Sequence, residues 1–159
     1  MSGPLRHPGD PPLVARCDLN ESAYPPLPAV ATALAEQARR AHRYPEFLPD
    51  TLRAAIATHL GVDPAAVTVG AGGTAVAFTI LQDCLTRTRT RRPRISTPVP
   101  TFDGFAILAR MLGATIDPSP LTPSGIPDLD ALLAGIGPDT AAVILCSPHN
   151  PTGAIIGNA

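Results

Sequence analysis

Short apolar segments alternate with segments of helical pattern through the second half of this chain. The apolar segments are Val67–Val69, Arg94–Thr97, Ala114–Ile116 and Ala141–Leu145. Helical patterns near residues 74–86, 101–112 and 128–134 fall between successive apolar segments. Such alternation is typical of a parallel sheet that is covered by helices and buried on both faces. The sequence therefore predicts an α/β fold.

Two further helices are expected before the alternating region. The first begins at Pro28, a favourable first helical residue, and ends near Arg40. The second runs from Asp50 to Leu60, and Gly61 follows it where a left-handed C-terminal cap is expected. Residues 1–16 are rich in proline and glycine and are expected to form a flexible arm.

The composition limits the classes of partner. Hydrophobic residues make up 45% of the chain and charged residues 16%, with a net charge of −1. This balance predicts a globular protein and gives no reason to expect a nucleic-acid or membrane partner. No apolar run reaches the ~18 residues of a membrane span, and the first residues do not resemble a signal peptide. A cytoplasmic location is expected.

The arginines, cysteines and histidines do not show the spacing of a nucleic-acid or metal site. Five arginines lie between Arg87 and Arg94, without the interleaved aromatic residues of a nucleic-acid surface, and are interpreted as a solvated face. The cysteines lack metal or redox spacing and are expected at core or boundary positions; they are Cys17, Cys84 and Cys146. The histidines lack ligand spacing and are expected to be exposed; they are His7, His42, His59 and His149.

A glycine-rich turn, Gly70–Thr74, lies between a predicted strand and a predicted helix. Glycines let backbone N–H groups approach an anion, and a helix N-terminus adds partial positive charge. The turn therefore forms either a phosphate cradle or only a tight connection. The spacing Gly70-x-Gly72-x-x-Ala75 also fits a dinucleotide-binding fingerprint, but Ile95–Pro98 carries none of the carboxylates that this motif requires. A Rossmann-like oxidoreductase remains an outside alternative.

Two further candidate residues follow predicted strands. The segment Ala141–Leu145 leads into an Asn-Pro-Thr-Gly turn, which places Asn150 at the carboxyl edge of the sheet, where open α/β folds bind ligands. Asparagine before proline is also ordinary turn chemistry. Phe102 follows the segment Arg94–Thr97 and opens a helix, a position where a phenylalanine usually belongs to the core. Neither residue alone identifies a site.

Together, five blocks in order resemble the class I/II, fold-type I pyridoxal-phosphate aminotransferases, in particular histidinol-phosphate aminotransferases. The blocks are Leu19–Pro26, Arg43–Glu46 with Leu52–Ala57, Val67–Thr74, Pro100–Phe102 and Cys146–Gly153. The resemblance implies a large domain with a mostly parallel sheet and a small domain built from both chain ends. It assigns residues 17–48 to an amino-terminal segment of the small domain and dimer arm. Residues 49–159 then form the first, incomplete part of the cofactor-binding domain.

The resemblance also implies roles for single residues. Gly72, Gly73 and Thr74 would bind the phosphate of pyridoxal 5′-phosphate. The ring of Phe102 would stack on the pyridine ring, and Asn150 would hydrogen-bond its 3′-oxygen.

The same resemblance implies roles for two tyrosines. Tyr44 would reach the cofactor phosphate of a neighbouring subunit, which implies a homodimer; the alternative is a packing tyrosine ahead of a proline. Tyr24 would line the substrate pocket. No metal site is implied.

The implied reaction is transfer of an amino group from an amino acid or amino-phosphate substrate to a 2-oxo acid. Histidinol phosphate, in amino acid biosynthesis, is the expected substrate, and aromatic amino acids are the second choice. Thr74–Ala75 stands where relatives commonly have an Asp-Glu pair, a departure from the histidinol-phosphate pattern.

The family requires a Schiff-base lysine, but all twelve basic residues here are arginine. In the family this lysine, the carboxylate that pairs with the pyridinium and the arginine that binds substrate all follow the Asn-Pro-Thr-Gly turn. The chain is therefore expected to be a truncated, amino-terminal part of such an enzyme, inactive alone and without catalytic residues of its own. The alternatives are a non-catalytic remnant and a small α/β binding domain.

Overall fold

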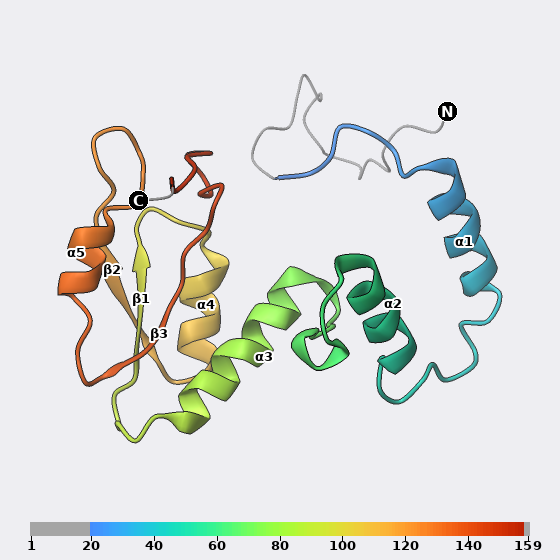
Figure 1. Cartoon of the computed structure of the whole chain (residues 1–159), viewed down its shortest axis with the longest axis horizontal. Coiled ribbons are helices and arrows are strands. Elements are labelled where there is room, and N and C mark those ends of the chain that lie inside the picture. Colours follow the sequence, from blue (N-terminus) through green and yellow to red (C-terminus); the bar gives the residue numbers. More distant parts are fainter. Residues whose placement is uncertain (1–19, 158–159) are drawn as a thin grey trace, which may run out of the picture. The chain divides into compact units, whose positions relative to one another are not determined.

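The computed structural model describes residues 20–157, which divide into two units between Leu48 and Pro49. The first unit contains one helix, α1 (Pro28–Ala38), which begins at a proline as the sequence predicts (Figure 1). None of its side chains is buried. Its apolar side chains Val30 and Leu34 and that of its N-cap residue Leu27 are all exposed, so this helix gains little stabilisation from burial within its own unit.

The second unit begins with α2 (Asp50–Leu60), a 3₁₀ turn η1 (Pro64–Ala66) and α3 (Gly72–Arg87). The predicted end of α2 is confirmed. Gly61 has a φ of +67°, in the left-handed region, and its N–H donates to the carbonyl groups of Ala57 and Thr58. Glycine adopts this conformation without the steric cost that a side chain brings.

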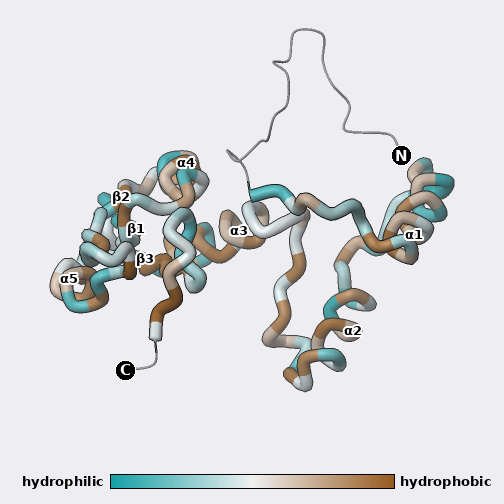
Figure 2. Tube along the Cα trace, turned by 90° about the horizontal axis from the view of Figure 1, so that it is seen from above, coloured by the Kyte–Doolittle hydropathy of each residue, from teal (hydrophilic) through white to brown (hydrophobic). Residues whose placement is uncertain are grey.

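A three-stranded parallel sheet follows, with the strand order β2-β1-β3. The strands are β1 (Arg94–Pro98), β2 (Thr115–Ser119) and β3 (Thr140–Val143), connected through α4 (Gly104–Met111) and α5 (Leu129–Ala134). Seen along the strands in Figure 2, α3 and α4 lie on one side of the sheet and α5 on the other. The α/β prediction is therefore confirmed, with helices on both faces of a parallel sheet.

The core lies between the sheet and the pair α3 and α4. Its centre is Ile95 on the middle strand, which is 0% exposed. Four other buried side chains complete the cluster: Leu81, Leu108, Ala109 and Ala114. The central strand is buried from Ile95 to Pro98 because helices cover both of its faces.

The prediction of a strand at Val67–Val69 is wrong, because this segment has no strand structure. The Val67 N–H donates to the carbonyl of Pro64 at 3.1 Å, which closes the 3₁₀ turn. The Val67 carbonyl accepts a hydrogen bond from Nε of Arg53 at 3.1 Å. Both backbone groups of Val67 are thus paired within the turn region rather than with a neighbouring strand.

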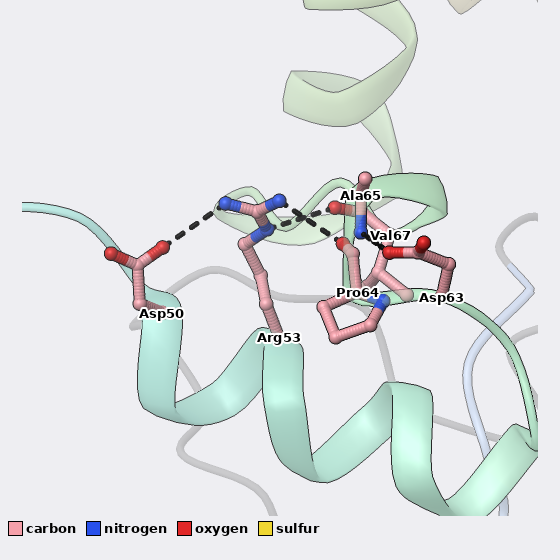
Figure 3. A network of polar contacts seen from close by, with 6 residues as sticks. All are labelled: Asp50, Arg53, Asp63, Pro64, Ala65 and Val67. Carbon is pink, nitrogen blue, oxygen red and sulfur yellow. Dashed lines mark hydrogen bonds and ion pairs between the residues drawn. The ribbon is translucent and has the colours of Figure 1, made fainter.

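Arg53 holds this turn region against α2 (Figure 3). Its Nη2 donates to the carbonyl of Pro64 at 3.0 Å, in addition to the bond from Nε to Val67. Its Nη1 lies 3.0 Å from Oδ1 of Asp50 on the same helix. The planar guanidinium can serve three acceptors at once, which a lysine ammonium in the same place could not match in geometry.

We expect Arg53→Met to lower the free energy of unfolding by about 1–2 kcal/mol, because two bonds to backbone carbonyls are lost. Arg53→Lys should recover only part of this, since the ion pair with Asp50 is exposed and contributes little. Urea unfolding of the variants measures both effects. The matched control is Arg87→Met, whose ion pair with Asp83 is exposed and should leave the midpoint unchanged. Equal midpoints for Arg53→Met and the control would contradict the assigned role.

The two outer strands of the sheet have different free edges. β2 carries Pro118, which has no N–H to donate. β3 has exposed apolar side chains at and beside its end, Val143 and Leu145. Proline is tolerated on edge strands and limits their further pairing.

The remaining surface features agree with the sequence analysis. In the arginine-rich segment, Arg87 pairs with Asp83 and Arg94 with Asp117, while Arg89, Arg91 and Arg92 are exposed.

Cys84 and Cys146 are half-buried free thiols, as expected for boundary positions. Cys17 and His7 lie outside the described residues. Among residues 20–157, no helix is both long and apolar enough to cross a membrane.

Candidate functional site

The segments that follow β1 and β3 meet at the carboxyl edge of the sheet. Ile144 N–H donates to the carbonyl of Ser96, and the hydroxyl of Thr97 donates to the carbonyl of Ile144 at 3.0 Å. Beyond these bonds, Nε2 of His149 lies 2.9 Å from the carbonyl oxygen of Pro100. The two loops are therefore joined at the place where open parallel sheets bind ligands.

The loop after β3 has its own internal bonds. The His149 N–H donates to the Ala154 carbonyl at 2.7 Å, and the Gly153 N–H donates to the His149 carbonyl at 2.6 Å. The hydroxyl of Thr152 donates to the Gly125 carbonyl at 2.8 Å, which fastens the loop to the connection between β2 and α5. Asn150 is half-buried in this closed turn.

The burial of His149 corrects the prediction that all four histidines are exposed. His42 and His59 are exposed as expected, but His149 is only 2% exposed. Its imidazole fills the space between the two loops and takes the Pro100 carbonyl as partner. A search for ligand spacing misses this residue. The signal that could have found it is its place directly before Asn150, in a turn that follows an apolar segment.

Phe102 borders a small pocket on the same edge, with a cavity volume of about 160 Å³. Its ring is 40% exposed and meets the ring of Phe105 edge-on, with centroids 5.4 Å apart. The ring also lies over Gly104: a Cβ added there would be 2.1 Å from Cε1 of Phe102. The phenylalanine is thus a partly open aromatic surface beside a pocket rather than a core side chain.

The N-terminus of α3 is suited to an anion. Its first residues are Gly72, Gly73 and Thr74, no side chain caps it, and its first turn contains no acidic residue. Gly72 has a φ of +84°, and no atom lies within 4 Å of a Cβ placed on Gly72 or Gly73. The Gly72 N–H donates to the Gly70 carbonyl at 2.9 Å, while the following N–H groups belong to the first turn of the helix, where the partial positive charge favours an anion.

The structure brings together only part of the predicted site. Phe102 and Asn150 lie on the two joined loops, but of these two only Phe102 lines the pocket, and the glycine turn does not line it either. Tyr44 and Tyr24 belong to the first unit and are 101% and 83% exposed. Tyr44 makes no packing contact within the described residues, and both its packing alternative and the contacts of the two tyrosines with cofactor or substrate stay predictions.

The residues present fit a phosphorylated aromatic cofactor. An accessible aromatic face, a side-chain amide and an uncapped helix N-terminus supply stacking, a hydrogen bond and a phosphate site, respectively. Residues 20–157 contain no cluster of three or more metal-ligating side chains. A primary amine for covalent attachment is not supplied by any side chain, since the 159 residues contain no lysine.

Comparison with known proteins places this arrangement in a family. A family model described as aminotransferase class I and II matches residues 17–159. An aromatic amino acid aminotransferase of Corynebacterium diphtheriae is 38% identical over 137 residues, which cover 86% of this chain and 39% of that protein. One from Nocardia farcinica is 38% identical over 140 residues, covering 88% of this chain and 38% of that protein. The chain thus spans about two fifths of the length of these relatives.

Solved structures agree on the fold. The histidinol-phosphate aminotransferase of Sinorhizobium meliloti, in complex with pyridoxal 5′-phosphate, superposes with a TM-score of 0.73 at 26% identity, covering 83% of this chain and 35% of that one. The expected partial fold-type I domain is confirmed, and the dinucleotide-binding alternative gains no support. Members of the family use pyridoxal 5′-phosphate. The chain belongs to the class I and II aminotransferases.

Proposed function

We propose that the protein to which these residues belong is a pyridoxal-phosphate-dependent aminotransferase that acts on aromatic amino acids and a 2-oxo acid. The observation that carries the cofactor part is the hydrogen bond from His149 to Pro100, which joins the loops of Asn150 and Phe102 at one edge of the sheet. An aromatic ring beside a pocket and an amide on the loop joined to it are contacts that a flat, polar ring needs.

When bound, pyridoxal phosphate supplies an electron sink for the bond changes at the α-carbon of the amino acid. The side chains here would bind and orient it. The Phe102 ring would offer its face to the pyridine ring, and the Asn150 amide would donate a hydrogen bond to the 3′-oxygen attached to that ring. The N–H groups of Gly73 and Thr74 at the start of α3 would bind the phosphate.

The reacting groups must come from elsewhere. Proton transfer at the α-carbon requires a basic amine, and no lysine occurs among the 159 residues. The residues described here therefore position the cofactor and do not act as the base. A homodimer with Tyr44 reaching the neighbouring site, a substrate pocket that includes Tyr24 and a cytoplasmic location are further parts of this proposal.

Aromatic amino acids replace histidinol phosphate as the preferred substrate. The two curated relatives at 38% identity are named for aromatic amino acids, while the histidinol-phosphate enzyme is a structural neighbour at 26%. Thr74 and Ala75 also depart from the Asp-Glu pair expected for the phosphorylated substrate. Both observations favour the substrate class without a phosphate.

The substrate proposal is tested with the protein isolated from the cells that produce it. We expect amino transfer to 2-oxoglutarate with kcat/KM at least about tenfold higher for phenylalanine or tyrosine than for histidinol phosphate, as expected when about 1.4 kcal/mol separates the two transition states. The reverse order would restore the histidinol-phosphate assignment. Cofactor binding without any amino transfer would support the non-catalytic alternative.

The 159-residue chain itself provides a chemical control. We expect it to bind pyridoxal phosphate reversibly and to lose it on dialysis, because it has no lysine to which the aldehyde could attach. After treatment with borohydride, mass spectrometry should find no cofactor on any side chain. A stable side-chain adduct, or no binding at all, would contradict the assigned cofactor contacts.

A further inference from the structure

We infer that His149 is a positioning residue that sets the separation between the cofactor-binding groups Asn150 and Phe102. The expected effect of His149 on cofactor binding rests on the proposed function. The claim that His149 holds the two loops together rests on their geometry alone. His149 directly precedes Asn150, and its bonding partner Pro100 lies two residues before Phe102. One side chain thus connects the two segments that carry the amide and the ring.

The hydrogen bond defines which nitrogen carries the proton. A carbonyl oxygen can only accept, so Nε2 of His149 must donate to Pro100 across the 2.9 Å contact. In the neutral ring, Nδ1 is then the bare nitrogen. It is buried and has no hydrogen-bond partner, which leaves the contact to Pro100 as the polar interaction that fixes the ring.

The bonds between β1 and the segment after β3 extend as far as Thr97 and Ile144, and the two loops continue beyond them. Among the described residues, the hydrogen bond from His149 to Pro100 is the one that joins segment 98–103 to segment 145–154. The turn around Asn150 is closed internally by bonds between His149 and both Gly153 and Ala154. The imidazole N–H is therefore the point at which this turn is held against the loop of Phe102.

A histidine could also be buried there simply to fill space, and two substitutions separate the alternatives. The glutamine amide nitrogen can occupy the place of Nε2, so His149→Gln retains the donor. The asparagine amide nitrogen lies nearer the place of Nδ1, so His149→Asn is polar but cannot reach Pro100. If His149 only fills space, the cofactor affinities of the variants should rise and fall with their stabilities. If His149 positions the loops, the affinity should depend on whether the amide nitrogen can donate to Pro100.

The experiment measures the dissociation constant for pyridoxal phosphate of the 159-residue chain by spectroscopic titration, together with the thermal midpoint. We expect His149→Gln to bind within about twofold of the unaltered chain and His149→Asn to bind about tenfold more weakly, the size of one lost hydrogen bond. Equal dissociation constants for the two variants, or constants that follow the thermal midpoints, would overturn the inference.

A second measurement does not require the cofactor. ¹⁵N NMR of the unaltered chain should show the proton of His149 on Nε2, and amide exchange at Gly153 should be faster in His149→Asn but not in His149→Gln. A proton on Nδ1, or the same exchange rate in both variants, overturns the inference. If the unaltered chain binds no pyridoxal phosphate, the proposed function fails, and these two NMR results alone decide whether His149 holds the loops.

Discussion

The Ile95→Ala variant is expected to lose about 2–5 kcal/mol of unfolding free energy, the usual cost of removing a large buried aliphatic side chain. Ile95 lies on the central strand at 0% exposure and touches the cluster formed with α3 and α4. Two members of that cluster, Ala109 and Ala114, are alanines and cannot expand to fill the cavity. Since domains are stable by roughly 5–15 kcal/mol, the loss is a large share of the total.

Urea unfolding followed by circular dichroism measures this loss. Ile107→Ala on α4 is the matched control, because Ile107 is 47% exposed and buries much less apolar surface. We expect the control to cost less than about 1 kcal/mol. Equal losses for the two variants would mean that the sheet and its helices do not form the core described here.

The Gly104→Ala variant is expected to bind pyridoxal phosphate up to about tenfold more weakly while its fold remains as stable or becomes more stable. A Cβ at this position would lie 2.1 Å from Cε1 and 2.4 Å from Cζ of Phe102, so the ring must leave its present place. An aromatic stacking contact contributes about 0.5–1.5 kcal/mol, which sets the expected loss. Alanine favours a helix over glycine by up to about 1 kcal/mol, and Gly104 begins α4.

A variant that is only misfolded would lose both cofactor affinity and stability. Gly104→Ala is instead expected to lose affinity while its stability is unchanged or higher. Gly137→Ala is the control, because a Cβ there meets only Nη2 of Arg94 at 3.8 Å, an ordinary contact. Its dissociation constant should equal that of the unaltered chain. If Gly104→Ala binds the cofactor as tightly as the control, the present position of the Phe102 ring is not the one that contacts the cofactor.

Local signals predicted most of the secondary structure. Pro28 and Gly61 mark helix ends by the dihedral angles they favour, and both helices are found there. The strand β1 agrees with the alternation of short segments and helices along the chain, although Ile95 is its one large aliphatic residue and the buried Ser96 and Thr97 are polar. The segment Val67–Val69 belongs to the same alternation but forms no strand, since its pairing depends on Arg53, fourteen residues away, and on the carbonyl of Pro64. Hydrophobicity alone does not encode such a partner.

The site was predictable where it follows from the topology. Phe102 and Asn150 come after neighbouring parallel strands, so their loops had to meet at one edge. The burial of His149 was not predictable from spacing, because its partner is a backbone carbonyl 49 residues away. Tyr24 and Tyr44 illustrate a different limit: their implied partners are a substrate and a second subunit, which no local pattern in this chain describes.

Pro118 limits the pairing of further strands with the outer edge of β2. Because β2 presents a residue without an N–H at the outer edge, its ladder is interrupted for any strand arriving from that side. β3 has no proline within Thr140–Val143 and ends among exposed apolar side chains. Any further strand, from the same polypeptide or another, is therefore expected to pair with β3. The sheet can be extended at the edge of β3 but not readily at the edge of β2.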